Sequence, residues 1–397
     1  MTVNNTVFSV DAPTAKELII RDGKRIEDAT KIEYANDPAA IEKGNRFAED
    51  IEKNFIADFE KFADKMVHVS TFCLIDDIVY MTYYANTQAD KEDPAYQTAR
   101  LVYCPLDNPA EKTFIDIQSV GDDCYGFKVQ MVYDTILMKK DSDTLIVMWT
   151  AKVNDNYYRF YRTYSIPAKR LGDVKVNRFK VGQTENDFST TGIQKALAEN
   201  GVFCKQMYSD IGIMQKFTTR VEDGKKYYYT GAYSGDFTCV IKSCDFVTWE
   251  YVSQPSFDNL SKWENATYVK GNKCYYFVRQ QNEEKDGFLT VYDLEKKTWE
   301  TPVLIEDCQS RSDFIEYKGS LYLIHAPIDR EHIGIVRIDE KNIADSRPIL
   351  LAHMHSSCFY PFVQYLKGDV LGMSYTVNRE HIRMSSFVLD DYLSHTY

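Results

Sequence analysis

The sequence lacks most of the features that mark membrane-spanning or nucleic-acid-binding proteins. Across 397 residues no apolar run approaches the ~20 residues that a bilayer-spanning helix needs. Basic residues are in the minority, with 47 Lys and Arg against 59 Asp and Glu, so the formal net charge is −12. A general nucleic-acid or membrane-surface role would require a basic footprint instead. We therefore expect neither nucleic acid nor membrane among the partners.

Paired cysteines are absent as well. The nine cysteines are scattered and none belongs to a CxxC pair, which disfavours a zinc site and a disulfide framework. Several lie inside apolar stretches, where a thiol behaves as a small hydrophobe. The first thirty residues show no basic segment followed by an apolar one, so we expect no signal peptide. Together these features predict a cytoplasmic protein that uses no metal and no cofactor.

What the chain does contain is a short apolar, aromatic-rich phrase that occurs six times. The copies span 79–84, 144–150, 226–233, 273–279, 320–326 and 369–376. Turn residues such as Asp-Asp or Lys-Gly precede the copies, which is typical of strands entered from tight hairpins. The last four copies start at 226, 273, 320 and 369, at intervals of 47, 47 and 49 residues. A period in the forties predicts one propeller blade per copy, and hence an all-β, six-bladed β-propeller.

Two helical segments interrupt this pattern. Asp37-Pro38 can begin a helix that runs to Asp64. Its apolar residues recur mostly at three- or four-residue steps, at Ile41, Phe47, Ile51, Phe55, Phe59 and Phe62. A short second helix is expected over 190–200, before Gly201. We therefore predict an N-terminal arm and amphipathic helix (1–65) packed on a catalytic propeller domain (66–397). The Phe-rich helix face leaves a homo-oligomer open.

Three segments in the second half carry candidate chemical groups. Glu264 follows Trp263, and Arg279 lies fifteen residues later at the end of the fourth phrase. Arg330 lies just beyond the fifth phrase, and Tyr360 is followed by a proline ahead of the last phrase. As an ordered set over about 263–389, these segments resemble the sialidase (neuraminidase) superfamily. In that family a Glu and an Arg end one hairpin of the fourth blade, another Arg follows the next blade, and a Tyr-Pro pair precedes a final "YT…R" segment.

The resemblance implies a glycoside hydrolase that removes a terminal acidic sugar, such as sialic acid, from an oligosaccharide. Tyr360 would be the nucleophile, and Glu264 would activate it, because a phenol with a pKa near ~10 is a poor nucleophile at neutral pH. A neutral nucleophile also avoids repulsion by the carboxylate of the sugar. Arg279 and Arg330 would hold that carboxylate through charge-assisted hydrogen bonds. The structural alternatives are that Tyr360 only packs within the propeller and that Glu264 is a carboxylate on the surface of a hairpin.

The remaining roles are assigned from loops. For the general acid the resemblance points to the segment 88–94, in which we choose Asp93 over Asp90 and Glu92; Asp210 is the competing acid. Arg311 competes with Arg330 for the clamp or contacts substrate from the preceding loop. Arg379 ends the last phrase and would bind a sugar hydroxyl or close a salt bridge.

One departure from the family keeps other functions open. Sialidases carry a first-blade Arg in an "RIP"-like triplet, whereas the matching stretch here contains His68 and no Arg. We expect His68 to occupy that place as a substrate-binding residue, and His355 is a further candidate for substrate binding. Without that Arg, a polysaccharide lyase acting on uronates through His355 or Tyr360 remains an alternative. A non-catalytic carbohydrate-binding propeller is a third.

A last motif is assigned to structure rather than to chemistry. Ser243, Asp245 and Trp249 resemble the "S-x-D…W" corner of propeller glycosidases, but the Gly of a full sialidase Asp-box is missing. Ser and Asp would close a turn and Trp would pack between strands. Because this variant of the motif is closer to the one in five-bladed propeller enzymes, a five-bladed glycosidase is an alternative fold.

Overall fold

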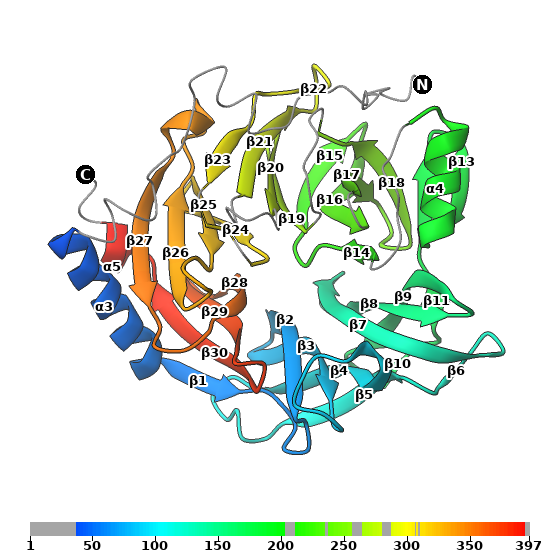
Figure 1. Ribbon diagram of the computed structural model, residues 1–397, viewed down its shortest axis with the longest axis horizontal. Coiled ribbons are helices and arrows are strands. Elements are labelled where there is room, and N and C mark those ends of the chain that lie inside the picture. Colours follow the sequence, from blue (N-terminus) through cyan, green and yellow to red (C-terminus); the bar gives the residue numbers. More distant parts are fainter. Residues whose placement is uncertain are drawn as a thin grey trace.

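The structure is a computed structural model that describes residues 37–202, 211–234, 237–255, 264–279, 287–305, 307–308 and 310–393. Its strands form six sheets arranged in a ring (Figure 1). The expected mainly β, propeller-like arrangement is therefore confirmed. No helix in the described ranges is long and apolar enough to cross a membrane.

The sheets follow one another along the chain, and their strands are as follows. The first contains β2 (Met66–Ile75), β3 (Ile78–Asn86), β4 (Gln97–Pro105) and β5 (Thr113–Ser119). The second contains β6 (Asp123–Cys124), β7 (Phe127–Lys139), β8 (Thr144–Val153), β9 (Asn156–Ser165), β10 (Arg170–Leu171) and β11 (Lys175–Val176). The third contains β12 (Arg178–Val181), β13 (Thr184–Asp187), β14 (Ile211–Ile213), β15 (Thr218–Glu222), β16 (Lys225–Ser234), β17 (Phe237–Ser243) and β18 (Thr248–Ser253).

The other three sheets complete the ring. The fourth contains β19 (Asn265–Lys270), β20 (Lys273–Arg279), β21 (Gly287–Asp293), β22 (Thr298–Trp299) and β23 (Val303–Ile305). The fifth contains β24 (Asp313–Tyr317), β25 (Ser320–His325), β26 (His332–Arg337) and β27 (Arg347–His353). The sixth contains β28 (Phe359–Lys367), β29 (Val370–Val377), β30 (His381–Val388) and β1 (Phe55–Asp58). The helices are α3 (Pro38–Lys53), η1 (Pro94–Tyr96), α4 (Thr190–Glu199), η2 (Ile343–Asp345) and α5 (Asp390–Leu393).

Each of the six phrases forms one strand, and each strand belongs to a different sheet. The strands are β3, β8, β16, β20, β25 and β29. Burial explains their composition, because a hydrophobic cluster fills the space between every two neighbouring sheets, including the sixth and the first. Both faces of these strands are therefore covered, which selects apolar and aromatic residues over an alternating pattern.

The N-terminal helix is shorter than the apolar pattern predicts. Asp37 caps α3, as expected, but the helix ends at Lys53 and is followed by β1, which pairs with β30 of the sixth sheet. Phe47 and Ile51 pack into the core between the fifth and sixth sheets. Phe62, by contrast, is fully exposed, at 105%. The prediction of a helix to Asp64 is wrong because the strand edge of β30 supplies backbone partners to 55–58. Residues 1–36 lie outside the described ranges.

The second helix and the Ser-Asp-Trp corner agree with expectation. α4 begins after Ser189, whose hydroxyl accepts from the Gly192 amide, and it ends one residue short of the predicted limit. Between β17 and β18, Asp245 accepts hydrogen bonds from the amides of Val247 and Thr248, and Trp249 is fully buried in the core. The motif therefore holds a turn. The wide spacing of the second and third phrases comes from α4 together with β12 and β13, which join the third sheet beside β18.

Candidate active site

Five strands that face the centre of the ring, β2, β7, β19, β24 and β28, position the candidate site (Figure 1). Three of them break register with the next strand, namely β2, β7 and β28. On each of these strands one break includes a non-glycine residue with positive φ, at Val69 (56°), Asp134 (52°) and Tyr360 (56°). Such conformations cost of order 1–3 kcal/mol each and concentrate at functional sites. The irregularities bend these strands and re-aim their side chains.

Tyr360 and Glu264 meet directly. The phenol of Tyr360 donates a hydrogen bond to Oε1 of Glu264 over 2.7 Å. Glu264 lies just before β19 and is 4% exposed, while the amide of Tyr360 donates to the Ser310 hydroxyl over 2.9 Å, which anchors its backbone. Residues 96 positions apart in the sequence are thus in contact across the ring. The sequence-predicted pair comes together.

Two arginines hold the Glu264 carboxylate. Arg279, at the end of β20, pairs with Oε2, and its Nη1 also donates to the Tyr360 oxygen over 3.2 Å. Arg311, before β24, donates to Oε1 over 3.1 Å. Burial alone would raise the pKa of the Glu264 carboxyl, but the two guanidinium groups outweigh it and lower the pKa to about 2. Glu264 is therefore ionised throughout the neutral range.

The same surroundings keep Tyr360 protonated. Burial and the nearby negative charge of Glu264 raise the pKa of the phenol, against the opposing effect of Arg279 and Arg311. At neutral pH the pair is a neutral phenol hydrogen-bonded to a carboxylate. That arrangement can pass a proton from oxygen to oxygen once an electrophile approaches the phenol.

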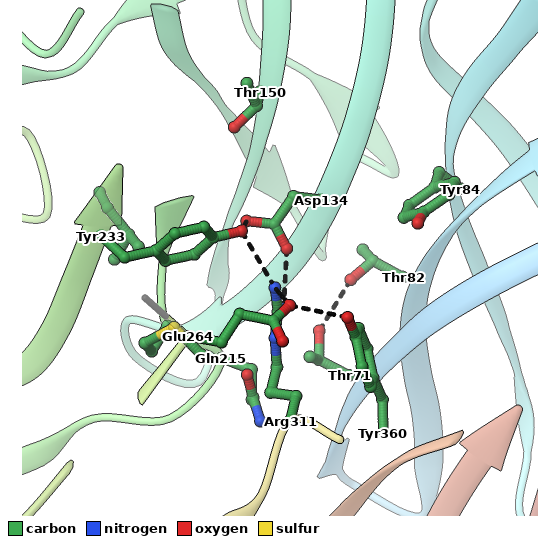
Figure 2. Close-up of polar contacts among 12 residues, drawn as sticks. Thr71, Thr82, Tyr84, Asp134, Thr150, Gln215, Tyr233, Glu264, Arg311 and Tyr360 are labelled. Carbon is green, nitrogen blue, oxygen red and sulfur yellow. Dashed lines mark hydrogen bonds and ion pairs between the residues drawn. The ribbon is translucent and has the colours of Figure 1, made fainter. Parts of the chain in front are cut away.

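A second ionic cluster supports Arg311, and the sequence did not reveal it. Nη1 of Arg311 pairs with Asp134 over 2.7 Å, and Asp134 also pairs with Arg159 over 3.1 Å. Tyr233 links the two clusters, since its hydroxyl lies 3.3 Å both from Asp134 and from Nη2 of Arg311 (Figure 2). These residues are at most 4% exposed. A lone Asp in the apolar segment 131–138 is the one signal that could have indicated Asp134.

Close packing explains a glycine beside this cluster. A Cβ on Gly212 of β14 would lie 2.0 Å from the Tyr233 ring and 2.7 Å from the Asp134 carboxylate. Only glycine leaves room for both groups at this position.

Arg330 and Arg379 both lie against Phe359, the residue before Tyr360. Both guanidinium carbons stand over the ring of Phe359, at 5.3 and 5.8 Å. Within the described part of the chain no carboxylate pairs with Arg330. Burial lowers its pKa, and so does the positive charge of Arg279. Arg330 is thus a cation close to other cations, which is the electrostatic character of an anion site.

Arg379 is paired with a loop carboxylate. Its Nη1 lies 2.9 Å from Glu92, and Glu92 also accepts from the Tyr84 hydroxyl over 2.6 Å. The neighbouring Asp93, the residue predicted as general acid, instead accepts from the Ala95 amide over 3.1 Å and caps η1. The competing acid, Asp210, lies outside the described residues.

The two predicted histidines occupy different surroundings. His68 is 1% exposed and stacks on the Tyr360 ring, with the ring centroids 4.5 Å apart. His355 is exposed, and its ring contact is with His353, at 4.6 Å. The structure therefore brings together Glu264, Arg279, Arg311, Tyr360 and His68, while none of the contacts of His355 connects it to Tyr360.

Comparison with known proteins finds similarity at the level of the fold only. No family model matches the sequence, and no curated protein matches it. Among solved structures, NanB sialidase from Streptococcus pneumoniae, bound to optactamide, aligns with a TM-score of 0.57 and 10% identity over 86% of this chain and 72% of that chain. The fold resembles that of sialidases.

Two further structures give the same result. The Hadza microbial sialidase Hz136 aligns with a TM-score of 0.59 and 11% identity over 83% of this chain and 67% of that chain. A leech intramolecular trans-sialidase, complexed with 2,7-anhydro-Neu5Ac, aligns with a TM-score of 0.53 and 9% identity over 84% of this chain and 70% of that chain. Identities this low establish the fold alone.

Proposed function

We propose that this protein is a sialidase-like glycoside hydrolase that cleaves a terminal acidic sugar from an oligosaccharide. The observation that carries the proposal is the 2.7 Å hydrogen bond from Tyr360 to Glu264, surrounded by buried arginines. In the proposed reaction the phenol oxygen attacks the anomeric carbon as its proton passes to Glu264. The glycosidic bond breaks at the same time, and the departing oxygen of the leaving sugar takes a proton from the general acid. Water then releases the sugar from the tyrosyl intermediate. The likeness to sialidase structures supports this reading at the level of the fold.

The proposed anion subsite consists of Arg279, Arg330 and Arg379. Arg330 contributes a guanidinium without a carboxylate partner among the described residues. Arg379 belongs to the turn between β29 and β30, and its backbone oxygen accepts from the Val67 amide of the first sheet over 2.8 Å. It therefore stands beside the segment in which the family's first-blade Arg is missing. Arg311, which already pairs with two carboxylates, is better suited to support than to substrate binding.

Two of the three arginines are paired with carboxylates of the protein itself, Arg279 with Glu264 and Arg379 with Glu92. A substrate carboxylate would compete for both guanidinium groups. Because Arg279 lowers the pKa of Glu264, sharing its charge with a substrate would make Glu264 a stronger base. In this proposal, binding of an acidic sugar activates the base, and a neutral sugar lacks that effect.

The general acid comes from the loop 88–94 in this proposal. Asp93 remains the sequence-based prediction, but its carboxylate caps η1. Glu92 has the contacts expected of a group facing the site, since it reaches Tyr84 and Arg379. We therefore favour Glu92. In this proposal Glu92 donates the proton that the departing oxygen receives as the glycosidic bond breaks.

We further propose that each of the six sheets is one blade and that 66–397 is the catalytic unit, with β1 completing the sixth blade. The cytoplasmic location and a homo-oligomer stay predictions.

A paired activity assay tests the proposal. Purified protein is given a fluorogenic sialoside, and in parallel a uronate-containing oligosaccharide whose cleavage by elimination produces an absorbing unsaturated product. Release of the fluorophore is the expected result. The unsaturated product alone would favour the lyase. Glycan binding without either product would favour a binding module and overturn the hydrolase.

A further inference from the structure

His68 occupies an enclosed position between the first and sixth sheets. Its imidazole lies at 29° to the ring of Tyr360, close to parallel, with centroids 4.5 Å apart. The rings of Tyr84 and Phe359 make T-shaped contacts with it, with centroids 5.8 and 6.0 Å away. On its polar side, Nδ1 lies 3.1 Å from the hydroxyl of Thr376, which is fully buried on β29. Aromatic rings and one hydroxyl thus surround the imidazole.

These contacts leave His68 unable to serve as an anion ligand. The residue is 1% exposed. A protonated imidazole would also face unfavourable surroundings, because burial and the charges of Arg379, Arg311 and Arg330 lower the pKa of His68 well below its usual range, and Glu264 only partly offsets them. A neutral ring stacked on another ring is a packing partner.

The orientation of the Tyr360 ring depends on the side chains around it. Its backbone has a φ of 56°, and its strand breaks register between Phe359 and Phe362, so the regular ladder does not fix its side chain. The ring is instead oriented by contacts: His68 stacks on it, and the guanidinium of Arg311 lies 5.0 Å from its centre. The phenol oxygen can meet Glu264 only if the ring keeps this orientation.

We propose that His68 is a positioning residue that holds the Tyr360 ring against Glu264 as a neutral stacking partner, with Thr376 fixing the imidazole. The inference rests on the proposed function for its kinetic consequence and on geometry alone for the stack. It assigns His68 to the support of the nucleophile, whereas the sequence placed it among the substrate-binding groups.

Three substitutions separate the roles of the side chain. His68→Phe keeps a neutral stacking ring, His68→Gln keeps a partner for Thr376 without the ring, and His68→Arg provides the cation of a clamp. His325→Gln is the matched control, because His325 is also fully buried and neutral, with its pKa lowered to about 4 by burial, but it contacts Cys308. Each variant is assayed for kcat and KM on the sialoside and for unfolding from pH 8 to pH 4.

With His68→Gln we expect kcat to fall ~10–100-fold at nearly unchanged KM, because a misplaced reacting group loses rate rather than affinity. His68→Phe should retain most of kcat, His68→Arg should lose kcat without lowering KM, and His325→Gln should leave kcat of the folded enzyme unchanged. A lower KM in His68→Arg would overturn the proposal, and so would equal kcat in His68→Gln and wild type.

The pH series tests the stack without any turnover. Because the folded protein keeps His68 neutral, the unfolded chain binds more protons as pH falls below about 6.5, and stability is lost in that range. His68→Phe should therefore lose less stability between pH 6.5 and pH 4 than wild type does. A parallel loss in the two proteins contradicts a neutral buried His68. If wild type turns over no sialoside, the proposed function fails. The pH comparison still decides whether His68 is a buried, neutral ring.

Discussion

The two sides of the ring differ in the backbone that positions the groups of the candidate site. In the first, second and sixth sheets, the strand facing the centre breaks register with its neighbour, at Val69, Asp134 and Tyr360. In the fourth and fifth sheets, β19 and β24 pair with their neighbours without any shift. The regular sheets place charged groups where strands begin or end. The irregular sheets place a phenol and a carboxylate within a strand.

This difference follows from what each group requires. A guanidinium has a long, flexible stem, so Arg279 at the last residue of β20 and Arg311 two residues before β24 reach the centre from regular backbone. The Tyr360 ring must meet one carboxylate at hydrogen-bond distance, and a bulge re-aims it in a way that a regular strand does not. Among the five centre-facing strands named above, positive-φ residues therefore occur only in β2, β7 and β28, on the side that holds the proposed nucleophile.

The largest expected effect comes from removing the aimed group on the irregular side. Tyr360→Phe keeps the ring, its stack on His68 and its place beside Arg311, and it removes only the oxygen bonded to Glu264. If Tyr360 is the nucleophile, kcat should fall ~10³-fold or more, with little change in KM. Stopped sialoside assays on wild type and variant measure this. Tyr365→Phe, on the same strand but half-exposed, is the control. Retained activity in Tyr360→Phe would end the nucleophile assignment.

The same division explains what the sequence could reveal. Charged residues at or just beyond the ends of apolar phrases stand out in a linear pattern, so Glu264, Arg279 and Arg330 could be named as candidates from the sequence. Glu264 lies just before β19, Arg279 ends β20, and Arg330 lies in the connection between β25 and β26. The six strands and α4 were predictable too, because each is a contiguous run with its own turn or cap. Bulges leave no such signal, because a strand with an extra residue has the same kind of sequence pattern as a regular strand.

Long-range ionic clusters are hidden for a second reason. Asp134 and Arg311 are far apart in sequence and share no motif, yet they pair over 2.7 Å. The role of His68 depends in the same way on Tyr360, which comes from the other end of the chain. The helix to Asp64 was overpredicted because its apolar spacing fits a helix, while β30 offers a free edge that captures 55–58.

A stability effect of similar importance is expected where the two sides are tied together. Lys216, between β14 and β15, donates over 2.6 Å to the backbone oxygens of Phe314 and Val363, and pairs with Asp313 over 2.7 Å. The pair therefore joins the third, fifth and sixth sheets. Lys216→Met would leave Asp313 buried without its cation, which typically costs about 3–5 kcal/mol. Denaturant unfolding of the variant measures the loss.

The double variant Lys216→Met, Asp313→Asn distinguishes a lost ion pair from lost packing. If the charge pair is the cause, the double variant should be less destabilised than the sum of the two single variants, because no unpaired charge remains. Additive losses would instead show that each side chain contributes on its own and that the two sides of the ring are held by packing.

The smallest of these effects concerns a long side chain on the regular side. Arg330→Ala removes the cation that no described carboxylate neutralises, together with the guanidinium that stands over the Phe359 ring. If Arg330 binds the substrate carboxylate before and during reaction alike, KM should rise ~10–100-fold at nearly constant kcat. Arg337→Ala, an exposed position on β26 of the same sheet, should change neither constant. A fall in kcat with constant KM would mean that Arg330, like the irregular strands, serves the transition state, and the division of labour between the two sides would no longer hold.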